Sequence, residues 1–66
     1  MNDEASRFQA FLNRMEDMCR NRGLVPLSEI NELAEKEGLR GSAVIDELVV
    51  TEGINIDYGR GVIVCR

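Results

Sequence analysis

The stretch that decides the fold is INIDYGRGVIVC, residues 54–65. Its first part alternates apolar and polar residues, a pattern typical of a strand with one buried face. Its last part, Val62–Cys65, is an apolar, β-branched run, and the Gly59–Gly61 loop between the two parts has the chemistry of a tight turn. Two such runs around a glycine-containing loop predict a β-hairpin.

A long helix is expected before the hairpin, over Ser6–Arg22. Ser6 and Gln9 match a capping box, so Met1–Ala5 are expected to be disordered. The apolar residues of this segment recur on one helical face: Phe8, Phe11, Leu12, Met15, Met18 and Cys19. The acidic and basic residues between them are expected to pair along the helix, as in Glu16–Arg20.

Two shorter helices are expected next. The first runs near Pro26–Glu37, and Gly38 closes it. After a tight connection, Ser42 is expected to cap a helix that carries an apolar stripe and stops at Gly53. The pair Leu24–Val25 is expected to add a third strand to the hairpin. This order predicts one α+β domain over residues 6–66, a three-helix bundle on which the hairpin packs.

The element order resembles that of the winged helix-turn-helix superfamily. The segments that carry the resemblance are VPLSEI (25–30), LAEKEG (33–38), and 44–48 leading to 52–54. Within that superfamily the chain is similar to the C-terminal winged helix of the minichromosome-maintenance replicative helicases, where a long first helix precedes the helix-turn-helix and a short wing closes the chain. The resemblance implies a non-catalytic accessory or regulatory module of nucleic-acid metabolism, in replication or transcription, that acts mainly through protein contacts.

The third helix departs from the DNA-reading pattern of winged helices. That helix usually donates Arg, Lys, Asn or Gln to base edges. Here its polar positions hold Ser42, Asp46, Glu47, Thr51 and Glu52. Carboxylates repel a phosphate-lined groove, so base readout by this helix is not expected.

Weak phosphate contact is the remaining route to nucleic acid. Its candidates are Arg40, Ser42, Arg60 and Arg66. The arginines either form a small cluster that contacts phosphates or are three solvated surface residues. The alternative function is a dimeric DNA-binding transcriptional regulator, with arginines of the wing and of the first helix on the DNA backbone.

A protein-binding surface is the second candidate site. This surface consists of the acidic residues expected to be exposed on the second and third helices: Glu29, Glu32, Glu35, Asp46 and Glu47. These residues either dock a basic segment of a partner or form an ordinary solvated face. Val50 falls outside the apolar stripe, so it either joins such a contact patch or packs under the wing. Tyr58 either stacks on a base or, as the pattern favours, covers the hairpin.

Composition limits the function further. With eight basic and twelve acidic residues the net charge is −4, which argues against a general polyanion binder. The chain has no histidine, phosphate-binding loop or metal-ligand spacing, so we expect no enzyme activity, cofactor or metal. Cys19 and Cys65 permit one disulfide, but two reduced thiols are expected in the cytoplasm. No membrane span or signal peptide is expected. The expected partner is another protein or a larger parent chain.

Overall fold

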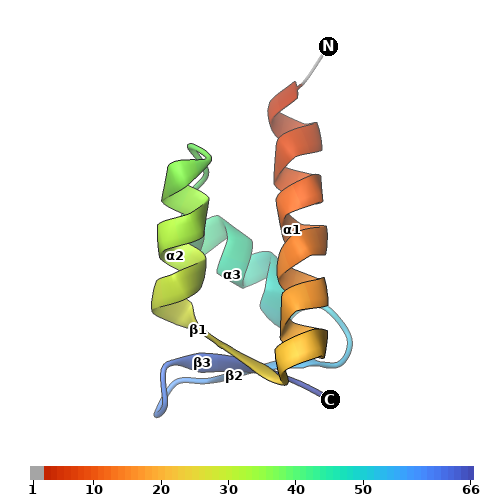
Figure 1. The fold of residues 1–66 in the computed structure, drawn as a ribbon, viewed down its shortest axis with the longest axis vertical. Coiled ribbons are helices and arrows are strands. Elements are labelled where there is room, and N and C mark those ends of the chain that lie inside the picture. The colour runs from red at the N-terminus through yellow and green to blue at the C-terminus, as the bar shows by residue number, and fades with distance from the viewer. Residues whose placement is uncertain (1–2) are drawn as a thin grey trace.

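A computed structural model describes residues 3–66. Its elements, in chain order, are α1 (Asp3–Arg22), β1 (Leu24–Pro26), α2 (Leu27–Lys36), α3 (Gly41–Val49), β2 (Ile54–Asp57) and β3 (Val62–Cys65). Figure 1 shows α1 and α2 standing side by side, with α3 crossing behind them and the strands gathered at one end. The predicted α+β class and the predicted order of elements are confirmed.

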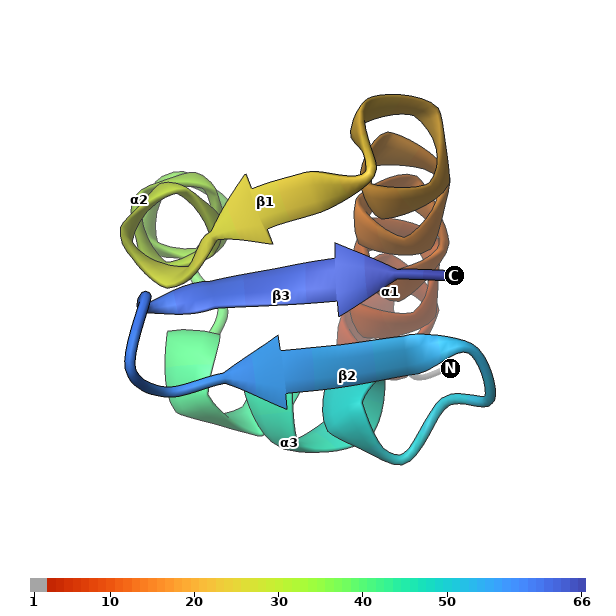
Figure 2. The same ribbon diagram turned by 90° about the horizontal axis from the view of Figure 1, so that it is seen from below.

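The three strands form one antiparallel sheet in the order β1-β3-β2. The third strand expected at Leu24–Val25 is confirmed and includes Pro26, which lies on an edge strand where its missing N–H is tolerated. Figure 2 shows β3 in the middle of the sheet, running from beneath α2 to beneath α1. The turn between β2 and β3 therefore lies on the α2 side, and the C-terminus lies on the α1 side.

One face of the sheet closes the hydrophobic core. Ile63 pairs with Val25 on one side and Ile56 on the other, and Val25 and Ile63 are fully buried. The rest of the buried cluster comes from the three helices, from Leu39 in the α2–α3 connection and from Ile54 of β2; the helical members are Phe11, Leu12, Met15, Cys19, Ile30, Ala34, Val44 and Leu48. A two-stranded hairpin is unstable alone, so this packing holds the strands in place.

The first helix begins earlier than the capping motif predicts. The helix α1 starts at Asp3, so Asp3–Ala5 form its first turn and the expected disorder of this segment is wrong there. For Met1 and Asn2 that prediction lies outside the described residues. Ser6 lies inside the helix and does not cap it. The carboxylates of Asp3 and Glu4 favour the earlier start, because negative charge near a helix N-terminus is stabilising.

The starts of the two later helices also differ from prediction. Pro26 has extended backbone and precedes α2, which begins at Leu27. Arg40 is the N-cap residue of α3, and the helix begins at Gly41. Ser42 lies in the first turn of α3 and makes no capping hydrogen bond, so its predicted role as a cap is wrong.

Candidate interaction surface on the third helix

The helix α3 presents a polar face to solvent opposite its buried stripe. Val44 and Leu48 point into the core with no exposed surface. Ser42, Asp46 and Val50 follow one another at intervals of four residues, so they share the opposite face. All three are exposed, and Val50 keeps 76% of its surface accessible. Val50 is therefore exposed and does not pack under the β-hairpin.

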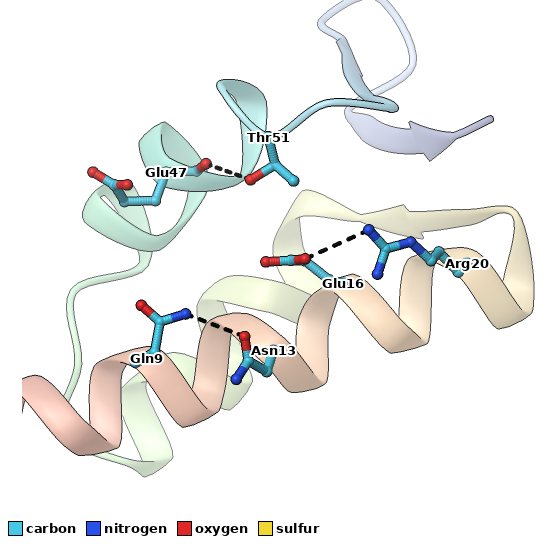
Figure 3. Close-up of polar contacts among 6 residues, drawn as sticks. All are labelled: Gln9, Asn13, Glu16, Arg20, Glu47 and Thr51. Atoms are coloured by element: carbon cyan, nitrogen blue, oxygen red, sulfur yellow. Dashed lines mark hydrogen bonds and ion pairs between the residues drawn. The ribbon is translucent and has the colours of Figure 1, made fainter.

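The charge of this face is negative and unbalanced. Between Gly41 and Val49, α3 carries two carboxylates, Asp46 and Glu47, and no basic residue. Neither carboxylate forms an ion pair within residues 3–66. The hydroxyl of Thr51 donates to the backbone carbonyl of Glu47 over 3.0 Å (Figure 3). The side-chain carboxylate of Glu47 takes no part in this hydrogen bond. A surface of this charge repels the phosphates of a nucleic-acid groove.

The predicted acids of α2 divide into one paired residue and two unpaired ones within residues 3–66. Glu29 pairs with Arg22 across 2.7 Å and so belongs to the side of α2 that faces α1. The hydrogen bond and the charge of Glu29 raise the pKa of Arg22. Glu32 and Glu35 are exposed, and in the described residues they have no ion-pair partner.

The three candidate phosphate-binding arginines lie in three separate places. Arg40 lies in the connection between α2 and α3, at the end of α2 that is far from the sheet (Figure 1). Arg60 lies in the turn between β2 and β3, and Arg66 follows the other end of β3. Figure 2 shows these two ends of β3 beneath different helices. All three side chains are exposed, but the fold does not bring them together as a cluster.

The hairpin turn is held by the chain itself. The backbone N–H of Arg60 donates to Asp57 Oδ1 (3.1 Å), and that of Gly61 donates to the Asp57 carbonyl (2.8 Å). The Gly61 carbonyl in turn accepts from the N–H of Leu27, at the start of α2 (2.9 Å). Tyr58 lies beyond the end of β2 and is 80% exposed, so the interpretation that it covers the hairpin is wrong.

Two ion pairs that the sequence did not indicate join α1 to α2. Arg22 pairs with Glu29, and Arg14 pairs with Glu37, the C-cap residue of α2. The Arg14 guanidinium also lies 5.2 Å from the centre of the Phe11 ring. The partners of each ion pair are more than four residues apart in the sequence, so the spacing of charges along a single helix does not predict these pairs.

The pairing expected within α1 is also present. Arg20 and Glu16 approach to 3.6 Å, as the spacing predicted, and Gln9 donates to Asn13 over 3.1 Å (Figure 3). These contacts use polar groups on the outer side of α1. They leave Arg7 exposed and without an ion-pair partner in residues 3–66.

An open groove of about 800 Å³ lies between the start of α1 and the α2–α3 connection. Phe8, Leu39 and Ala43 supply the apolar lining of this groove, and Arg40 lies at its side.

Within residues 3–66, no three His, Cys, Asp or Glu side chains come together to hold a metal ion. None of the described helices has both the length and the apolar character needed to cross a bilayer. No family model, curated protein or solved structure matches this chain.

Proposed function

We propose that this chain is a non-catalytic, winged-helix-like accessory module that binds another protein through the exposed face of α3. The observation that carries the proposal is the make-up of that face, which combines two unpaired carboxylates with an exposed valine: Ser42, Asp46, Glu47 and Val50. The order of the helices and the small antiparallel sheet support the winged-helix-like assignment. From the resemblance to winged-helix domains we propose a role in replication or transcription.

The geometry favours a protein partner over DNA. In winged-helix proteins that read DNA, the third helix enters the major groove and donates hydrogen bonds to bases. Here Asp46 and Glu47 occupy that helix, and no basic residue on α3 offsets them. The net charge of −4 adds a repulsive field over the whole chain.

The partner surface that fits α3 is apolar in its centre and basic at its edge. Covering Val50 removes apolar surface from water, which favours association. Lysine or arginine side chains beside it would meet Asp46 and Glu47. Exposed charge pairs of this kind contribute more to association rate and partner choice than to affinity. The interaction is therefore expected to weaken at high salt without disappearing.

Partner capture with surface variants tests the proposal. The tagged chain is crosslinked in a nuclease-treated extract of its source cells, and the captured proteins are quantified by mass spectrometry. Asp46→Lys/Glu47→Lys and Val50→Asp change the α3 face, whereas Asp17→Lys changes an exposed acid of α1 as the matched control. We expect one partner that the wild type and the Asp17 variant retain and that both α3 variants lose. Equal capture by all four proteins would contradict the proposal.

The rival function is a dimeric DNA-binding regulator that contacts the phosphate backbone through arginines. It is supported by the exposure of Arg40, Arg60 and Arg66, none of which is neutralised by an ion pair in residues 3–66. Their positions weaken it, because the three arginines come from separate segments and do not form one phosphate-binding cluster. Binding by several arginines would fall steeply as salt rises.

A further inference from the structure

The two cysteines lie far apart in the chain, and in the fold both belong to the core or pack against it. Cys19 lies on the buried stripe of α1 and has no exposed surface. Cys65, the last residue of β3, pairs with the buried Ile54 and is two residues from the buried Ile63, so its side chain lies on the inward face of the sheet. Figure 2 shows this end of β3 passing beneath α1.

A single residue ties the two cysteine backbones together. The N–H of Gly23 donates to the Cys19 carbonyl over 2.7 Å, and the Gly23 carbonyl accepts from the N–H of Cys65 over 3.0 Å. The side chains are also in contact. Burial raises the pKa of the Cys19 thiol to about 11, and a hydrogen bond with the Cys65 thiol is the next cause. The two thiols are therefore neighbours between the end of α1 and the end of β3.

We propose that Cys19 and Cys65 form a reversible intramolecular disulfide that joins the end of β3 covalently to α1. Both thiols are free in the structure. The bond would fix the sheet against the first helix, because β3 is the central strand and pairs with both of its neighbours. This property is independent of the partner-binding function proposed for α3.

A small-molecule disulfide of the glutathione type is the oxidant. Cys65 is partly exposed, so its thiolate attacks one sulfur of the oxidant, forms a mixed disulfide and releases one small thiol. Cys19 then loses its proton and attacks the sulfur of Cys65. The Cys19–Cys65 bond forms as the bond to the oxidant breaks, and a second small thiol leaves. Two protein thiols become one disulfide, and one small disulfide becomes two thiols.

The raised pKa of Cys19 makes its attack the slow step. Only the thiolate is nucleophilic, and a thiol with a pKa of about 11 is almost fully protonated at neutral pH. The mixed disulfide at Cys65 should therefore accumulate first and convert more slowly to the internal bond. Once formed, that bond links α1 to the penultimate residue and restricts most of the unfolded chain. The oxidised protein should melt on the order of 10 °C or more above the reduced protein.

Oxidation of the full chain with glutathione disulfide tests the proposal. Intact mass, a non-reducing gel and a thermal melt are recorded before and after oxidation, and again after a reducing dithiol is added. We expect a monomer that has lost two hydrogens, melts higher, and returns to its starting mass and melting temperature on reduction. Cys65→Ser should give neither the internal bond nor the higher melting temperature.

Three results would overturn the proposal. One is a wild-type protein that stops at a mixed disulfide on Cys65. The second is a disulfide-linked dimer in place of an oxidised monomer. The third is full retention of both thiols under conditions that oxidise a small dithiol. Cys19→Ala serves as a second control, because it should hold the mixed disulfide at Cys65 permanently.

Discussion

Gly41, the first residue of α3, lies directly against Asn31 in the middle of α2. A Cβ atom at Gly41 would collide with the side-chain amide of Asn31 and would lie only 3.1 Å from the α-carbon of that residue. The backbones of the two helices therefore approach each other at a point that admits no side chain. This approach helps to set the angle of α3, and with it the direction of the face that carries Asp46 and Val50.

Replacing this glycine should destabilise the protein. Gly41→Ala forces Asn31 or the start of α3 to move, and overpacking of this kind costs about 1–3 kcal/mol of unfolding free energy. Gly59→Ala is the matched control, because its Cβ meets only an ordinary neighbour at 3.5 Å. Urea denaturation measures both variants. Adding Asn31→Ala to Gly41→Ala should recover part of the loss, since it removes the amide but leaves the backbone of α2 where it is. Equal stability of the two glycine variants would contradict this account.

The sequence was sufficient to predict what depends on neighbouring residues. The order of elements followed from local periodicity, which changes from helical to alternating after Gly53. Gly38 was expected to close α2, and it does so with a left-handed φ of 71°. The extent of α1 was missed because Ser6 satisfies a capping motif while Asp3–Ala5 are themselves compatible with a helix. A local capping motif shows where a helix can begin, but it does not show which of several possible start positions the helix uses.

Relationships across the fold were beyond the reach of the sequence. The close approach of Gly41 to Asn31 depends on how two helices cross. The pairing of Arg14 with Glu37 depends on α1 and α2 lying side by side. For the candidate site, periodicity placed Val50 outside the buried stripe. It could not show that Arg40, Arg60 and Arg66 lie apart, because their separation depends on the path of the whole chain.

The two sides of α3 should respond very differently to truncation. Leu48 has no exposed surface, so Leu48→Ala should lower the free energy of unfolding by about 2–5 kcal/mol. Val50→Ala on the exposed side should change it by about 0.5 kcal/mol or less. Thermal and urea denaturation of the two variants measure the contrast. A large loss with Val50→Ala would show that this residue packs against the protein and is not free to meet a partner.

Arg14 should contribute more to stability than an unpaired arginine of the same helix. Arg14→Ala loses the ion pair with Glu37 and the contact with the Phe11 ring, which together are expected to be worth about 1 kcal/mol. Arg7→Ala, on the same helix, should be nearly neutral. The difference should shrink as salt is added, because both groups of the ion pair are partly exposed. A difference that is absent at low salt would rule out this role for Arg14.

Cys19 should make the reduced protein less stable at high pH. Its folded pKa of about 11 lies above the ordinary value of 9.0, so the folded state holds this proton more tightly than the unfolded state. The protonated Cys19 thiol therefore contributes fully to the free energy of unfolding below pH 9. This contribution is lost as pH rises from 9 toward 11, and the loss is on the order of 2 kcal/mol. Besides burial, the charges that act on it come from Cys65 on β3 and Arg20 on α1.

Denaturation curves at several pH values under reducing conditions measure this effect. Cys19→Ala supplies the reference, because it removes the titrating thiol from the same place in the core. The stability difference between the wild type and this variant should be constant below pH 9 and should fall above it. A difference that does not depend on pH would show that burial does not hold the proton on Cys19.

Titration of the isotope-labelled chain with duplex DNA, followed by its amide NMR signals, tests the central claim most directly. At about 50 mM salt, where phosphate contacts are stronger than at physiological salt, we expect the signals of Ile45–Val49, beyond the first turn of α3, to stay in place. Any small shifts should be confined to the surroundings of Arg40, Arg60 or Arg66 and should vanish as salt is raised. Saturable shifts centred on Asp46 and Glu47 would contradict the claim, because they would show that α3 enters DNA despite its carboxylates.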